Sequence, residues 1–322
     1  PLGALLPFLA VCAFAQTATT DPVGFIRKEC QLGYTGFATP LVSDPVFTGR
    51  ISSNSSANAT LEGGNLRLGD SISGAGPLYV EVISGPFEGE RIDIDEAATI
   101  TANGAAVTFD TGSVLNTTAP TPNSLVGATC VIRKHCTLAK LQAMFSPALT
   151  GNNNPNSADR VYLFENGSWI RYYLLKDNTT WLTAGNSKPQ SDKVIPPGTG
   201  ILVELKSSAK TALQLGAVRM NAFRINLTAG TQCIAPAFPV SLTPTQVGAF
   251  VDINEPATYR WTGNNNPAKS DTISPFITGS FIRYNLAKNG TTWLTSGSAE
   301  DYSDDAIIDY SAPALLKRKN PN

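Results

Sequence analysis

Gly151-Asn152-Asn153-Asn154-Pro155 opens a stretch that this chain contains twice. It returns as Gly263-Asn264-Asn265-Asn266-Pro267. Further on, Gly167-Ser168-Trp169-Ile170-Arg171-Tyr172 returns as Gly279-Ser280-Phe281-Ile282-Arg283-Tyr284, and Thr179-Thr180-Trp181-Leu182-Thr183 returns as Thr291-Thr292-Trp293-Leu294-Thr295. All three matches share the offset of 112 residues that separates Gly151 from Gly263. Three matches at one offset indicate an internal duplication.

Each copy consists of short apolar segments separated by turn residues, a pattern typical of antiparallel strands. In the first copy, Arg160–Phe164 and Ser168–Leu174 flank Asn166-Gly167, which predicts a two-residue hairpin turn. Ile201–Leu205 predicts a buried strand. Its counterpart, Ala312–Leu316, contains Pro313 and is a weaker strand candidate.

The chain as a whole predicts an all-β fold with few short helical turns. We expect an N-terminal antiparallel β-domain over 16–120, closed by the Thr/Pro/Asn linker 115–123. Two related β-sandwich or barrel-like repeats follow, over 121–215 and 216–322. A short helix is expected over Thr137–Phe145, capped by Thr137, and Ser241–Phe250 carries similar signals in the second copy.

Residues 1–15 carry no charge and end in Ala13-Phe14-Ala15, a pattern typical of the apolar region and cleavage site of a secretory signal peptide. A buried helix, an uncleaved anchor and a lipid-modified Cys12 are the alternatives. The charged fraction is 15% and the formal net charge is -1. We therefore expect a secreted bacterial protein of the extracellular space or cell surface, with no nucleic-acid partner and no membrane span in the mature chain.

Four cysteines follow the signal segment, and an even number in an exported chain predicts two disulfides. Ile26-Arg27-Lys28-Glu29-Cys30 is similar to Ile132-Arg133-Lys134-His135-Cys136. If cysteines in similar sequence contexts are joined, the disulfides are Cys30–Cys136 and Cys130–Cys233. The two other ways of pairing the four cysteines remain alternatives. No metal site is expected, because no C-x-x-C occurs and the only histidine is His135.

Several short motifs together resemble an uncharacterised paralogous family of secreted proteins best known from Verrucomicrobia. They are Thr20-Asp21-Pro22-Val23-Gly24-Phe25, the Ser-Gly…Phe-Glu-Gly turn at 84–89, and the two Gly-Ser-aromatic-Ile-Arg-Tyr hairpins. The resemblance implies export and an all-β, internally repeated body. It implies no activity, so no functional residues follow from it. The cysteines and the weak last strand depart from the family pattern.

The candidate binding residues are aromatic. Tyr172, Tyr173 and Tyr284 lie on predicted strands, where exposed rings bind sugars or partner subunits. Tyr173 is replaced by Asn285 in the second copy, so we expect it to face outward. Retention of Trp169/Phe281 and Trp181/Trp293 in both copies favours a role in the core.

No catalytic set and no cofactor are expected. The acids Glu88, Glu90, Asp93, Asp95 and Glu96 are interpreted as the solvated face of a strand, with a glycosidase pair or a cation site as the alternatives. Asp301, Asp304, Asp305 and Asp309 lack the spacing of a calcium loop.

The sequence therefore favours an exported, non-enzymatic structural protein that self-associates, including into filaments. Edge strands or exchange of the N-terminal segment would join the copies, and the weak last strand would leave a groove for a neighbour. The alternatives are an extracellular carbohydrate-binding module, with surface polysaccharide as partner, and a glycoside hydrolase-like enzyme.

Overall fold

The computed structural model describes residues 22–62, 76–95, 100–101, 104–110, 121–254 and 260–319. The predicted signal segment, residues 1–15, lies outside these ranges. Within them the all-β prediction is confirmed, because strands provide nearly all of the regular structure. The single helix among the described residues is α1 (Leu138–Gln142). No helix in these ranges is long and apolar enough to cross a membrane.

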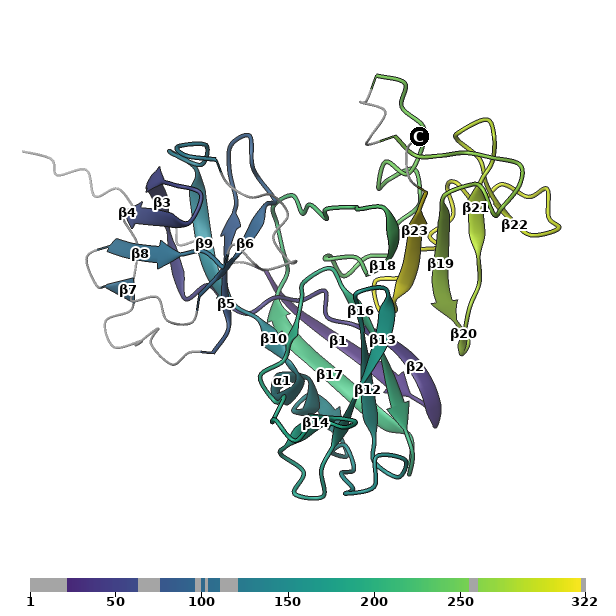
Figure 1. The fold of residues 1–322 in the computed structure, drawn as a ribbon, viewed down its shortest axis with the longest axis horizontal. Coiled ribbons are helices and arrows are strands. Elements are labelled where there is room, and N and C mark those ends of the chain that lie inside the picture. The colour runs from purple at the N-terminus through teal and green to yellow at the C-terminus, as the bar shows by residue number, and fades with distance from the viewer. Residues whose placement is uncertain are drawn as a thin grey trace, which may run out of the picture.

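The N-terminal sheet has seven strands in the order β6-β5-β9-β3-β4-β8-β7 (Figure 1). Ile94, at the end of β6, bridges Phe109, which follows β8, so the sheet curls until its two sides meet. The alternating apolar residues of its strands point inward and form one buried cluster. The strands are β3 (Phe47–Asn54), β4 (Asn58–Glu62), β5 (Leu78–Val82), β6 (Arg91–Ile94), β7 (Ile100–Thr101), β8 (Gly104–Thr108) and β9 (Thr129–Lys134).

The middle unit packs a five-stranded sheet, β14-β13-β12-β16-β2, against a three-stranded sheet, β1-β17-β11, with the core between them. The small pair β10–β15 and α1 close one side. Thr137 caps α1 as predicted, because its side chain accepts a hydrogen bond from the Lys140 backbone N–H. The strands are β1 (Val23–Cys30), β2 (Gly33–Ala38), β10 (Cys136–Thr137), β11 (Phe145–Ser146), β12 (Arg160–Glu165), β13 (Ser168–Leu174), β14 (Trp181–Thr183), β15 (Val194–Ile195), β16 (Gly200–Leu205) and β17 (Lys210–Ala217).

Strand pairing divides the chain differently from the predicted domain boundaries. β1 and β2 were expected in the N-terminal domain, but β1 pairs with β17 and β2 pairs with β16 of the middle unit. Conversely, β9 was expected in the first repeat and instead lies between β3 and β5 of the N-terminal sheet. The first two strands of the chain, β1 and β2, therefore belong to the middle unit. The N-terminal sheet follows in sequence, and the remaining strands of the middle unit come after it.

The C-terminal unit has the strand order β18-β23-β19-β21-β22, which matches β2-β16-β12-β13-β14 of the middle unit. β23 is the counterpart of β16 and lies between β18 and β19. The expectation that the weak last strand leaves an open groove is therefore wrong, because β18 and β19 occupy both of its edges. The strands are β18 (Gly230–Ile234), β19 (Thr272–Ile277), β20 (Ser280–Phe281), β21 (Tyr284–Leu286), β22 (Trp293–Thr295) and β23 (Ala314–Arg318).

The same hydrogen bonds recur in the two units at the offset of the sequence repeat. The Asp159 carboxylate accepts from the Thr150 N–H at 2.7 Å, and the Asp271 carboxylate accepts from the Thr262 N–H at 2.8 Å. The Ser191 and Ser303 hydroxyls each accept from the backbone N–H of a fully buried tryptophan, Trp181 and Trp293 respectively. The residues that the chain contains twice therefore make equivalent contacts in two sheets.

The two units meet through equivalent aromatic residues. Trp169 lies edge-on to Phe164, and Phe281 lies edge-on to Phe276. Trp169 and Phe281 then stack on each other at 6.1 Å between ring centroids. Beside them, a Cβ on Gly36 or Gly200 would lie within 2.6 Å of Pro313, so glycine at both positions permits the units to approach closely.

Candidate functional site

The three tyrosines predicted to bind a ligand are buried. Tyr172 belongs to the core of the middle unit, and its hydroxyl donates to Glu165 at 3.1 Å. Tyr173 is only 8% exposed, so the prediction that it faces outward is wrong. It lies directly opposite Arg160, on the sheet face that carries the buried Arg160–Glu204 ion pair, and this places charged side chains beside it. Tyr284 lines a pocket of the C-terminal unit.

Asp95 is exposed, as a solvated face requires, but other acids of the predicted cluster make bonds within the protein. Asp93 pairs with His135 at 2.9 Å, and the His135 ring lies 4.6 Å from that of Tyr79. Glu88 accepts from the Ala222 N–H at 3.0 Å, and Glu90 pairs with Arg224 at 3.3 Å. Glu88 and Glu90 thus attach the segment 219–224, which follows β17, to the N-terminal sheet. Glu96 lies outside the described residues.

A cleft of about 1240 Å³ lies where the three parts of the protein meet. Asp93, Asp95 and His135 line one wall, the β12–β13 hairpin lines another, and residues 225–234 line the third. Within the described ranges, no group of three histidine, cysteine, aspartate or glutamate side chains is placed to hold a metal ion. His135 is only 3% exposed, and its Nε2 pairs with Asp93.

The four cysteines are free thiols, so the two predicted disulfides are not formed. Cys130 belongs to the core of the N-terminal sheet, whereas Cys233 lies on β18 and donates to the Gly200 carbonyl. Cys30 and Cys136 both pack against the core of the middle unit. Burial raises the pKa of Cys30 to about 11 and that of Cys130 to about 12, which keeps both thiols protonated and weakly nucleophilic.

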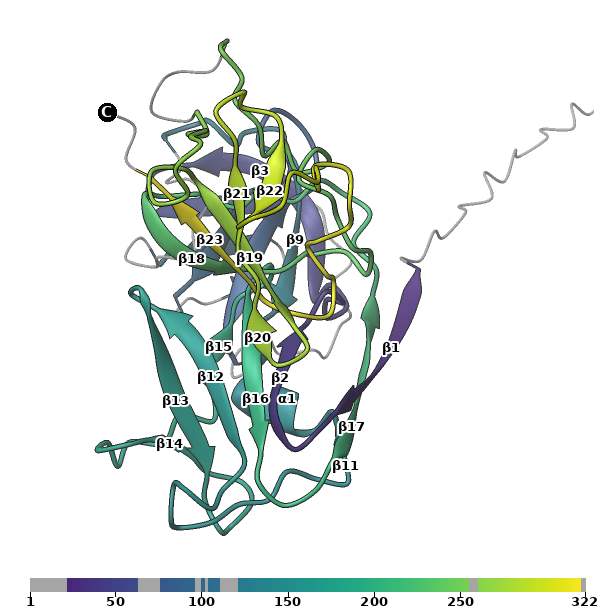
Figure 2. The ribbon, with the colours of Figure 1, turned by 90° about the vertical axis from the view of Figure 1, so that its right-hand side faces the viewer.

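The most exposed apolar surface belongs to the β1–β17 ribbon. β1 is an edge strand that runs along the side of the molecule (Figure 2). Phe25 lies opposite Leu215, so the two side chains share one face, and they are 61% and 71% exposed. Val23, at 78% exposed, and Leu213 extend the same face. Within the described residues, no backbone group pairs with the outer edge of β1.

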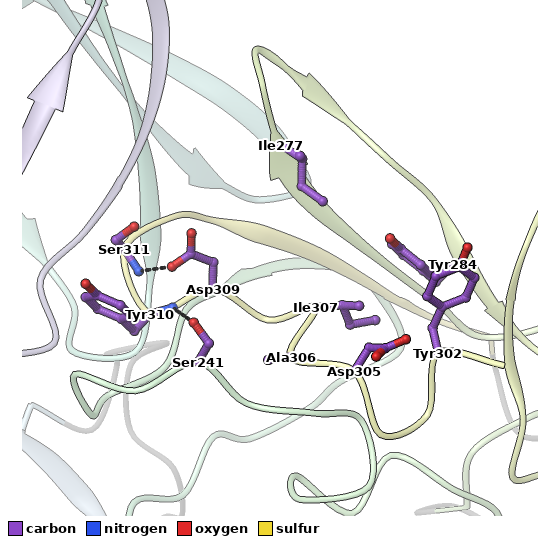
Figure 3. Close-up of a pocket in the computed structure, with 10 residues that line it drawn as sticks. All are labelled: Ser241, Ile277, Tyr284, Tyr302, Asp305, Ala306, Ile307, Asp309, Tyr310 and Ser311. Carbon is purple, nitrogen blue, oxygen red and sulfur yellow. Dashed lines mark hydrogen bonds between the residues drawn. The ribbon is translucent and has the colours of Figure 1, made fainter. Parts of the chain in front are cut away.

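The tyrosine pocket, of about 630 Å³, lies in the C-terminal unit between the loop Tyr302–Ser311 and the end of β19 (Figure 3). Tyr284 and Tyr302 stand together at one end, with their rings edge-to-face at 5.0 Å. Tyr310 stands at the other end, and Ile307 lies between (Figure 3). Burial, and then the charges of Asp305 and Glu300, raise the pKa of Tyr284, so its hydroxyl stays protonated.

Comparison of the chain with protein-family models, curated proteins and solved structures found no match. The function proposed below therefore rests on the geometry of the protein itself. Its three candidate surfaces are the junction cleft, the β1–β17 ribbon and the tyrosine pocket.

Proposed function

We propose that this protein is an exported, non-enzymatic structural protein of the cell surface or extracellular matrix, and that copies associate through the β1–β17 ribbon. One observation carries the proposal: four large apolar side chains, Val23, Phe25, Leu213 and Leu215, are exposed on one face of this ribbon. Scattered exposed apolar residues are ordinary, but a contiguous group on one face is typical of an interaction surface.

The backbone of the ribbon supports the same mode of association. A strand whose outer N–H and C=O groups have no partner pairs readily with a strand of another chain. The polar end of the ribbon, where Arg27 and Glu29 form an exposed ion pair, would fix where the partner strand stops. If the contact joins two different surfaces and does not close into a ring, repetition gives a filament.

The low charge of the chain favours association. With 24 basic and 25 acidic residues, copies do not repel one another through net charge. The segment Gln16–Pro22 directly precedes β1, and all of it except Pro22 lies outside the described residues. Exchange of this segment onto a neighbouring copy remains our proposed second contact.

Substitution of one ribbon residue tests the proposal. Phe25→Glu places a charge at the centre of the apolar face and should weaken association by about 2 kcal/mol, roughly thirtyfold. Ile253→Glu is the matched control, because Ile253 is 76% exposed but lies outside the ribbon. Light scattering over a concentration series should show smaller assemblies for Phe25→Glu alone. Equal assembly by wild type and both variants would exclude the ribbon as the contact.

A further inference from the structure

We propose that the tyrosine pocket of the C-terminal unit binds a neutral saccharide. The proposal concerns a second surface and does not depend on the β1–β17 ribbon. Its basis is a difference between the two copies at positions that the internal repeat makes equivalent.

In the middle unit, the equivalent positions are bridged by bonded side chains. Lys193 pairs with Glu165 at 3.0 Å, and Glu165 accepts from the Tyr172 hydroxyl. The counterparts of Glu165, Tyr172 and Lys193 at the 112-residue offset are Ile277, Tyr284 and Asp305. An isoleucine and an aspartate cannot form this ion pair, so the bridge is absent from the C-terminal unit. The Tyr284 ring therefore borders an open pocket.

A second aromatic ring accompanies the loss of the bridge. The position of Gln190 in the middle unit is taken by Tyr302, whose backbone N–H makes the equivalent bond to Trp293. Tyr302 packs edge-to-face on Tyr284 and lines the pocket. The changes at 277, 302 and 305 thus replace an ion pair and an amide with an apolar side chain, a ring and a single carboxylate.

The lining indicates the class of ligand. Tyrosine rings offer apolar faces to the C–H groups of a sugar, and their hydroxyls both donate and accept hydrogen bonds. Asp305 and Asp309 add carboxylates, which accept from sugar hydroxyls. The ten lining residues include no arginine or lysine. Lys28, which donates to the Ser311 hydroxyl, offsets the charge of Asp309, and the charge of Asp305 disfavours an acidic sugar or a phosphate. A neutral saccharide fits these groups best, and the pocket volume suits a short oligosaccharide.

The loop that forms the pocket is held in place before any ligand binds. Leu242 and Ile308 exchange two backbone hydrogen bonds, at 2.9 and 3.1 Å. The Ser303 hydroxyl donates to the Thr291 carbonyl at 2.7 Å, and the Asp309 carboxylate accepts from the Ser311 N–H at 2.8 Å. Such preorganisation lowers the entropy that binding must overcome.

The test replaces the pocket with its counterpart from the middle unit. The full chain is titrated by calorimetry with neutral gluco-, xylo- and manno-configured hexasaccharides, and we expect at least one to bind. In the variant Ile277→Glu/Tyr302→Gln/Asp305→Lys, the ion pair can form and that binding should weaken by about tenfold or more. Gln190→Tyr, the matched control in the middle unit, should bind as the wild type does.

Single-residue variants and charged probes complete the test. If the triple variant does not fold, Tyr302→Gln and Tyr310→Ala each remove one ring and should each weaken binding by about tenfold. Choline and a hexauronic acid serve as cationic and anionic probes. Binding of choline but of no neutral hexasaccharide, binding of none of the probes, or saccharide binding that survives all of these variants would overturn the proposal.

Discussion

The middle and C-terminal units share an equivalent strand order, a buried tryptophan and a buried aspartate, yet they expose different surfaces. The middle unit adds a second sheet, whose β1–β17 ribbon presents an apolar face. The C-terminal unit has no strand in the place of β17 among its described residues, and it opens the tyrosine pocket. The comparison indicates that the residues common to both copies build the unit, whereas the residues that differ create its surfaces.

The two equivalent buried aspartates, Asp159 and Asp271, have ion-pair partners on strands that are not equivalent. In the middle unit, the cation near Asp159 is Lys210 of β17, at 3.7 Å. In the C-terminal unit, the cation near Asp271 is Arg318 of β23, at 3.8 Å. Removing a carboxylate from water is costly, so each unit needs a positive charge nearby.

The largest effect is expected from the residues that the two units share most closely. Trp181→Ala and Trp293→Ala each remove a fully buried side chain and should each destabilise their own unit by about 3–5 kcal/mol. Hydrogen exchange resolved by unit, at increasing urea concentration, measures both. Comparable losses of stability in the two units would support the structural equivalence of the copies. A substitution that leaves the stability of one unit unchanged would contradict it.

A smaller effect is expected from the two cations. Lys210→Met and Arg318→Met each leave a buried carboxylate without its ion pair, at a cost of about 3 kcal/mol. The control Arg27→Met breaks an exposed ion pair and should cost less than about 1 kcal/mol. The same exchange experiment should show Lys210→Met acting on the middle unit and Arg318→Met on the C-terminal unit. A Lys210→Met variant as stable as the control would show that Asp159 does not need this cation.

The smallest difference concerns equivalent turns, and it depends on pH. Hydrogen bonds from the Thr180 hydroxyl and from the Thr179 and Thr180 N–H groups lower the pKa of Asp177 from 3.8 to about 2. Because this pKa is lowered on folding, its contribution to stability is present above pH 3.8 and is lost as the pH falls towards 2. In the C-terminal unit, the neutral Asn289 accepts the corresponding bonds from Thr291 and Thr292.

NMR amide exchange at both turns between pH 5 and pH 2 measures this difference. The bonds to Asp177 should weaken in acid while those to Asn289 persist, and Asp177→Asn should remove the pH dependence. A turn at Asp177 that remains protected at pH 2 would contradict the prediction.

Local features of the fold could be predicted from the sequence. The Asn166-Gly167 turn is present, with φ of 50° and 79° at the two residues, and the Thr137 cap of α1 is also present. The placement of β1 and β2 could not be predicted, because their partners β17 and β16 lie far along the chain and no local pattern identifies them. Burial of Tyr173 could not be predicted for a similar reason, since Arg160 and Glu204 beside it come from two separate strands, β12 and β16.

The candidate sites were only partly accessible to sequence reasoning. Tyr284 was selected, but as an exposed ring and not as part of a pocket. The signal that would have found the pocket was the difference between the copies, where Glu165 and Lys193 change to Ile277 and Asp305. The apolar face of the ribbon was missed, because exposure of Phe25 and Leu215 follows from the long-range pairing of β1 with β17.

Electron microscopy of the concentrated native protein, with Phe25→Glu and Ile253→Glu prepared identically, tests most directly whether the β1–β17 ribbon joins copies of this chain. We expect ordered assemblies for the wild type and for Ile253→Glu, and single particles for Phe25→Glu. Single particles in all three samples would contradict self-association, and assemblies in all three would contradict the role of the ribbon.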